Sequence, residues 1–184
     1  MKYDYLLKKC DLCRRHCGVN RLNGELGICT ANDNLIVARA ELHLWEEPPI
    51  SCENGSGTVF FSHCNLKCVF CQNHEISQEY KGAEITINRL SDIFLELQNK
   101  GANNINLVTP THYVPQIIEA IEIAKYKGII SLLMSLIFII TMSIKASSQY
   151  KEDFAFGNLL ILFISIAIFV IYIIIDVILR IIKG

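Results

Sequence analysis

The chain has 184 residues, of which 52% are hydrophobic and 19% are charged, and this composition excludes a disordered tail. The net charge of −1 gives no electrostatic basis for binding nucleic acid. All eight Cys and all five His precede Tyr113, whereas residues 129–184 hold only four Lys or Arg and three Asp or Glu. An evenly built globular domain is therefore excluded, and a metal-binding front part followed by a membrane-like tail is expected.

The first segment, Met1–Lys9, is polar and lacks the apolar stretch of a secretory signal. We therefore expect this part of the chain in the cytoplasm, where thiols stay reduced. Eight Cys in that compartment favour metal ligation, and a disulfide scaffold is the alternative.

Residues 1–55 are expected to form a Cys-rich metal-binding module. Asn23-Gly24 and Gly27 are turn residues that let the chain fold back, so that a later Cys approaches three earlier ones. Four thiolates hold either a tetrahedral zinc ion or a second iron–sulfur cluster, and the spacing does not decide between them. His16 is an alternative ligand, and Cys that bind nothing are the remaining alternative. The four candidate ligands are Cys10, Cys13, Cys17 and Cys29.

The sharpest motif is the C-x3-C-x2-C triplet of Cys64, Cys68 and Cys71, which follows a predicted buried strand over residues 57–62. A [4Fe–4S] cluster is usually held by four thiolates, so three leave one iron open to a small molecule. Zinc would more often show two C-x2-C pairs, and the triplet therefore favours an open cluster. Cys52 belongs to neither group and is expected to be a structural or uncoordinated thiol.

Residues 56–128 predict an α/β domain. The spacing of apolar residues predicts helices over 87–100, capped by Asn88 or Ser91, and over 114–127, with a strand over 105–108 between them. The order strand, cluster loop, helix, strand, helix is the beginning of a parallel βα barrel.

Residues 129–184 carry two apolar runs, about 129–144 and 154–175, separated by a short polar segment. A spanning helix needs about 20 apolar residues, which the second run has and the first approaches. Basic residues on the outer flanks, such as Lys127 and Arg180, predict a two-helix transmembrane hairpin with both ends in the cytoplasm. The alternative is a pair of buried core helices.

The triplet, with Phe70 directly before its last Cys, resembles that of the radical S-adenosylmethionine (SAM) enzymes. The motifs around Cys10–Cys29, Cys71–Ser77 and Asn106–Tyr113 are similar to the branch related to pyruvate formate-lyase activating enzyme. The likeness covers about residues 5–128. It implies a partial radical SAM-type barrel with a Cys-rich module before it and the membrane hairpin after it, because the later strands of the family's barrel are not found.

The resemblance implies that Cys64, Cys68 and Cys71 hold a [4Fe–4S] cluster whose fourth iron binds SAM. One electron would then cleave SAM and release a 5′-deoxyadenosyl radical. It further implies an electron donor such as flavodoxin or ferredoxin, and a protein substrate. Phe70 would contact the adenine or be core, and Thr109 would contact the cofactor. His112 would contact the cofactor or the substrate, or have a structural role in its loop. Thr109-Pro-Thr-His112 stands where the family often has Gly-Gly-Glu.

Two other interpretations stay open. One is a non-enzymatic, membrane-anchored iron–sulfur or zinc-binding module. The other is a truncated or frameshifted fusion product, because two βα units leave an exposed sheet edge and a half-built core.

Overall fold

The computed structural model describes residues 2–149. Their helices, in chain order, are α1 (Tyr5–Lys8), α2 (Pro48–Ser51), α3 (His74–Ser77), α4 (Ile87–Asn99) and α5 (Val114–Gln149), with 3-10 turns η1 (Arg21–Asn23) and η2 (Thr111–Tyr113). The strands are β1 (Ile36–His43), β2 (Ser56–Phe61), β3 (Ala83–Glu84) and β4 (Ile105–Val108).

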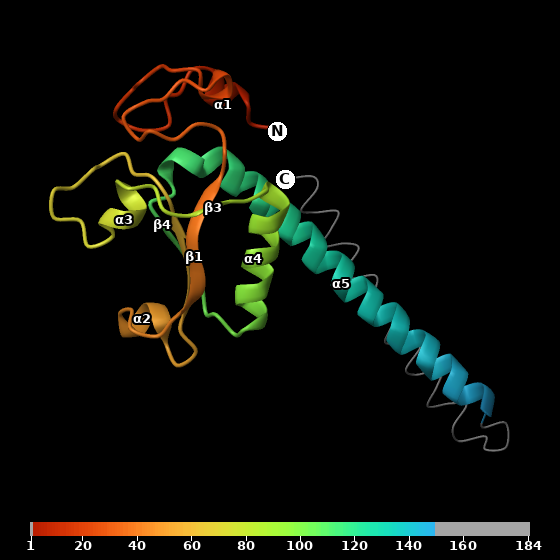
Figure 1. Ribbon diagram of the computed structural model, residues 1–184. Helices are drawn as coiled ribbons and strands as arrows, with labels where there is room; N and C mark the ends of the chain where they lie inside the picture. Colours follow the sequence, from red (N-terminus) through yellow and green to blue (C-terminus); the bar gives the residue numbers. More distant parts are fainter. Residues whose placement is uncertain (1, 150–184) are drawn as a thin grey trace. The chain divides into compact units, whose positions relative to one another are not determined.

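These strands form one open sheet in the order β3-β1-β2-β4 (Figure 1). β4 lies parallel to β2, with Val59 opposite Leu107, so β2, α4 and β4 form the predicted βα unit. β1 pairs antiparallel with β2 and with β3, and neither β1 nor β3 was predicted. The α/β fold with one open sheet is consistent with part of a radical SAM barrel, and it carries an antiparallel half that the sequence did not predict.

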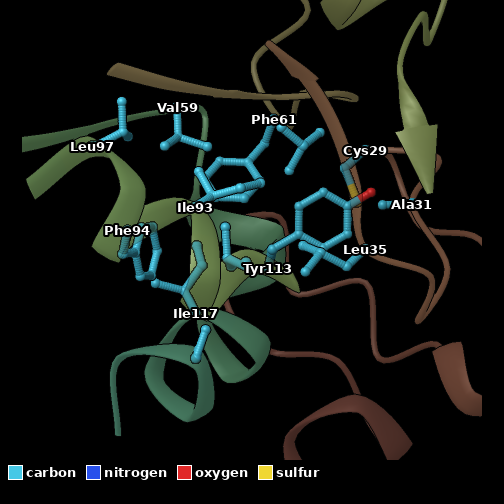
Figure 2. Close-up of a cluster of buried hydrophobic side chains, with 13 residues drawn as sticks. Cys29, Ala31, Leu35, Val59, Phe61, Ile93, Phe94, Leu97, Tyr113 and Ile117 are labelled. Atoms are coloured by element: carbon cyan, nitrogen blue, oxygen red, sulfur yellow. The ribbon is translucent and has the colours of Figure 1, made fainter. Parts of the chain in front are cut away.

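The core lies on the face of the sheet that α4 covers, and Figure 2 shows its side chains. Phe61 at the end of β2 contacts the ring of Tyr113, with ring centroids 5.8 Å apart. Apolar residues from the sheet, from α4 and from the beginning of α5 meet there, which is the burial that stabilises the unit. The buried members from β2 and α4 are Val59, Phe61, Leu90, Ile93, Phe94 and Leu97.

The N-cap of α4 differs from the prediction. Thr86 has extended backbone dihedrals, and its hydroxyl accepts a hydrogen bond of 3.1 Å from the Arg89 N–H. Asn88 and Ser91, the predicted caps, lie inside the helix, and Ser91 is buried. Thr86 is the cap because the chain enters the helix from an extended conformation at that residue.

The chain divides into two compact units at Lys127 and Gly128. The first unit contains the whole sheet, and β1 from the expected Cys-rich module is part of that sheet. The helix expected to end at residue 127 continues as α5 to Gln149.

Among the described residues, one helix, Thr111–Thr141, is long and apolar enough to cross a membrane, by length and composition alone. None of its described residues from 128 to 141 is buried, and exposed side chains include Ile130, Met134 and Phe138. The second predicted span, 154–175, lies outside the described residues.

Candidate metal centre at the carboxyl end of the parallel strands

Two loops meet at the carboxyl end of the parallel strands. The loop after β2 carries the cysteine triplet, and the turn after β4 carries Thr109 and His112. The hydroxyl of Thr109 donates to the carbonyl of Phe61 (2.9 Å), and Nε2–H of His112 donates to the carbonyl of Ser62 (2.8 Å). Parallel strands place their carboxyl ends at one edge, which is where ligands bind in open α/β sheets.

The three cysteines differ in exposure. Cys64 is buried, Cys71 is half-buried and Cys68 is exposed. Two thiols accept hydrogen bonds within the loop: the Leu66 N–H reaches Cys64 Sγ at 3.4 Å, and the Ser77 hydroxyl reaches Cys71 Sγ at 3.4 Å. Such donors to sulfur are among the features by which a protein tunes an iron–sulfur cluster.

The backbone around the triplet is strained. Three residues other than glycine have positive φ there: His63 (69°) and Lys67 (52°) in the cysteine loop, and Thr109 (54°) after β4. The left-handed region is least favourable for a β-branched residue such as Thr109. Strain of this kind persists where the surrounding structure fixes it, and it clusters at functional sites.

His63 connects this loop to the N-terminal coil. Its ring stacks on Tyr80 at 4.5 Å between centroids and lies 3.2 Å through Nδ1 from the Thr30 hydroxyl. Burial lowers the pKa of His63, against a hydrogen bond to the Cys29 carbonyl that raises it. A neutral ring in this position orients the loop beside Cys64.

His112, expected to contact the cofactor, is buried beneath the loops. Because Nε2–H donates to the Ser62 carbonyl, Nδ1 carries the lone pair, and this buried atom has no hydrogen-bond partner. Burial lowers the pKa of His112 to about 4, and the charge of Arg21 adds to this. The ring is therefore neutral at pH 7.

Phe70 is 98% exposed, so its core alternative is wrong. Its neighbours Leu66 and Val69 are also exposed. Three apolar side chains facing outward beside the cysteines form a surface suited to an apolar or aromatic partner.

The four N-terminal cysteines line one cavity. Cys29 is buried and the other three are half-buried. The cavity has a volume of about 20 Å³, and its wall includes Cys10, Cys13, Cys17, Cys29, His16, Arg21 and His112. Burial raises the pKa of the Cys29 thiol, although a backbone hydrogen bond from Ala31 and the charge of Arg21 oppose this. His16 contacts Asp11 through Nδ1 and is exposed. Cys52 is exposed.

Within residues 2–149, no three His, Cys, Asp or Glu side chains converge so as to hold a single metal ion. In a cubane cluster each thiolate binds a different iron, so three ligands of a cluster need not converge on one point. The triplet thus fits a cluster by its donor chemistry: three thiols on one loop, one of them exposed and two accepting hydrogen bonds.

A larger cavity, of about 320 Å³, lies between β1 and the chain that follows Cys71. Its wall carries charges of both signs, from Arg39, Glu75 and Lys81. It is separate from the cavity that the N-terminal cysteines line, because the two share no wall residue.

The family comparison covers the part of the chain that carries the cysteine triplet. The family model of the Radical SAM superfamily matches residues 58–152. The uncharacterized protein MJ0674 of Methanocaldococcus jannaschii is 43% identical over 75 residues, which is 41% of this chain and 21% of that protein. The match thus spans about a fifth of that relative's length. No solved structure matches.

With a family match over more than half its length, the chain belongs to the radical SAM superfamily. Membership in general implies a [4Fe–4S] cluster, SAM and an electron donor.

Arg21 was not predicted to be buried or to contact distant parts of the chain. The side chain is completely buried, and its guanidinium donates to the carbonyls of Ala31 (3.1 Å), Asn32 and His112 (2.5 Å). The signal in the sequence was an Arg between Val19 and Leu22, which does not identify a partner 91 residues away.

Proposed function

We propose that Cys64, Cys68 and Cys71 hold a [4Fe–4S] cluster and that the chain cleaves SAM reductively. The observation that carries this is the position of the triplet: one loop at the carboxyl end of β2, tied by Thr109 and His112 to the turn after the parallel strand β4. When bound, the cluster supplies one electron that breaks the C5′–S bond of SAM, giving methionine and a 5′-deoxyadenosyl radical.

The chain's own residues give the site its form. The Leu66 N–H and the Ser77 hydroxyl point toward negative sulfur atoms, and the stacked pair His63–Tyr80 holds the beginning of the loop. Gln78 fixes its middle, because its side-chain amide donates to the Cys68 carbonyl at 2.9 Å. Cys68 itself is exposed, which leaves that side of the loop open to SAM.

The resemblance to the branch of pyruvate formate-lyase activating enzyme gives the finer proposal, a hydrogen atom taken from a protein substrate. The outward-facing Phe70, Val69 and Leu66 support it, because a macromolecular partner buries apolar side chains. Phe70 would then lie against either the adenine or that partner. Electrons would come from a flavodoxin or ferredoxin.

The test is anaerobic reconstitution of the full chain in detergent. We expect about four iron and four sulfide per triplet cluster, a reduced-cluster EPR signal that changes when SAM is added, and formation of 5′-deoxyadenosine with dithionite. Cys68→Ala should lose the signal, whereas Cys52→Ser, at the exposed cysteine outside both groups, should keep it.

An unchanged EPR signal in Cys68→Ala would refute the ligand assignment. A cluster on the triplet without 5′-deoxyadenosine would refute the activity and support the non-enzymatic metal-binding module. Flanking DNA that encodes the missing strands in another frame would support a truncated or frameshifted fusion product.

We also propose that residues 129–144 and 154–175 anchor the chain in a membrane as a hairpin with both ends in the cytoplasm. The exposed apolar side chains of the first segment support this, since Ile137, Phe138 and Ile139 follow one another around the helix. Detergent should release the protein from membranes, whereas salt and alkaline carbonate should not. Recovery of the full chain as a soluble monomer without detergent would contradict the proposal.

A further inference from the structure

The four N-terminal cysteines are brought together by a coil rather than by regular structure. The Cys10 N–H donates to the Val19 carbonyl (2.9 Å), and the Gly18 N–H returns to the Cys10 carbonyl (3.0 Å). Gly18 has a φ of 64°, a conformation that glycine adopts without strain. These bonds close a loop around Cys13 and Cys17, so that both thiols lie near Cys10.

The second turn carries Cys29 to the same place. A Cβ at Gly27 would lie 2.9 Å from Cys17 Sγ, so only glycine allows the backbone to pass so close to that sulfur. The next N–H, of Ile28, donates to Cys17 Sγ at 3.4 Å. The backbone therefore passes close to the Cys17 sulfur and donates a hydrogen bond to it, as is common around a sulfur that ligates a metal.

A second observation points to a ligand in this cavity. His112 is 97% buried, belongs to the wall, and has an Nδ1 lone pair without a hydrogen-bond partner. An unpaired buried acceptor costs about 1–3 kcal/mol, and native structures rarely leave one without a reason. A lone pair is satisfied by a donor or a metal ion, so a metal centre in this cavity supplies the missing partner where Nδ1 of His112 takes the place of one thiolate.

We propose that Cys10, Cys13, Cys17 and Cys29 hold a second, thiolate-ligated metal centre that fixes the N-terminal coil against the loop of the triplet. Four thiolates suit a tetrahedral zinc ion or an iron–sulfur cluster, which share this donor chemistry. Among the described residues no three of these thiols converge on one point although all four line one cavity, so the proposal requires that binding draw the thiols together.

The coil reaches the triplet loop by two contacts and the turn after β4 by a third. Arg15, between Cys13 and Cys17, donates through Nε to the Asn65 carbonyl (3.2 Å), directly after Cys64. Thr30, after Cys29, contacts His63, directly before Cys64. Arg21 donates to the His112 carbonyl at 2.5 Å. A metal that fixes the coil therefore also fixes the residues on either side of Cys64. This coupling, but not the metal site itself, rests on the proposed function.

The site is tested apart from the triplet in the full-length variant Cys64→Ala/Cys68→Ala/Cys71→Ala, purified anaerobically in detergent. We expect one zinc ion per chain, or iron and sulfide in equal amounts, and the metal analysis separates these two. Adding Cys13→Ser/Cys17→Ser should abolish that metal, and adding Cys52→Ser should leave it unchanged. A triple variant without metal after reconstitution with zinc or with iron and sulfide, or full metal content in the quintuple variant, would overturn the site.

A measurement on the unmodified chain tests the site without depending on whether the variants fold. Thiol labelling mapped by mass spectrometry before and after metal removal should show Cys10, Cys13, Cys17 and Cys29 newly reactive beside the three thiols of the triplet, whereas Cys52 reacts throughout. Equal reactivity before and after removal would overturn the proposal.

The coupling has its own readout. With the triplet intact, Cys13→Ser/Cys17→Ser should speed tryptic cleavage after Arg14 or Arg15 by about tenfold, the factor that 1.4 kcal/mol of lost order produces. It should also shift the EPR signal of the triplet cluster. Unchanged cleavage and an unchanged signal would overturn the coupling, while the metal site would stand on its own analysis.

Discussion

The buried guanidinium of Arg21 gives the sharpest test of how the N-terminal coil is held on the βα domain. The change is Arg21→Met, which keeps the length and the apolar stem but removes the charge and every donor. In the structure the guanidinium donates to three carbonyls, those of Ala31, Asn32 and His112, and its carbon lies 6.0 Å from the centre of the Tyr113 ring.

The expected loss in the free energy of unfolding depends on which of the three carbonyls stay buried without a donor. The Arg21 bonds to Ala31 and His112 are buried, and the bonds to Asn32 are only partly so. Water can therefore replace the donor at Asn32 but not at the other two. Two unsatisfied buried acceptors cost about 1–3 kcal/mol each. The variant also avoids the desolvation of a charge, which offsets part of this. We expect a net loss of about 2–4 kcal/mol in the free energy of unfolding.

The assay is urea unfolding of the full chain in detergent under reducing conditions, followed by pulse proteolysis. Arg14→Met is the matched control, because Arg14 is exposed in the same coil, and it should change stability by less than about 0.5 kcal/mol. Arg21→Lys should lose most of what Arg21→Met loses, since one ammonium cannot reach the same carbonyls as a planar fork. A stability of Arg21→Met within 0.5 kcal/mol of the parent would refute this reasoning.

Three further changes test the fold with the same unfolding assay. Thr86→Ala removes the N-cap of α4 and should cost about 1 kcal/mol, whereas Asn88→Ala, at the residue wrongly predicted as cap, should cost less than half of that. Leu97→Ala, at a position 2% exposed, should cost about 2–5 kcal/mol because it leaves a cavity between α4 and the sheet; a cost below 1 kcal/mol would contradict that packing. Gly57→Ala should cost about 1–3 kcal/mol by overpacking, because a Cβ there would lie 2.9 Å from Ile105 Cδ1 and 3.1 Å from Leu97 Cβ, and a neutral result would show that these side chains move aside.

The elements that the sequence determined by itself are those with a strong local signal. Helix α4 has apolar residues at helical spacing, and the predicted range 87–100 differs from Ile87–Asn99 by one residue. Strand β4 was predicted with its observed bounds, and β2 with a shift of one residue. The spacing of the cysteine triplet indicated an open cluster, and the triplet with Phe70 and its neighbouring motifs carried the resemblance to the radical SAM superfamily, because such motifs are a property of the sequence alone.

β1 was missed because its pattern is mixed. Arg39 and Glu41 interrupt the apolar residues, and a bulge between Val37 and Arg39 breaks the alternation that identifies a strand. In the sheet the Arg39 Nε forms an ion pair of 3.2 Å with Glu41 Oε1. The Arg39 guanidinium also lies over the Phe60 ring, 4.8 Å from its centroid. Only a partner strand makes such a segment extended.

The site divides in the same way. Sequence spacing identified two groups of cysteines. Only the tertiary structure showed that Cys10, Cys13, Cys17 and Cys29 line one cavity and that His112, distant in sequence, belongs to its wall. Arg21, which joins the coil to the turn after β4, acts on a carbonyl 91 residues away. Contacts between residues so far apart in sequence depend on how the coil packs on the sheet, so no local pattern predicts them. The buried guanidinium needs carbonyl acceptors from several segments, and these come together only in the folded chain.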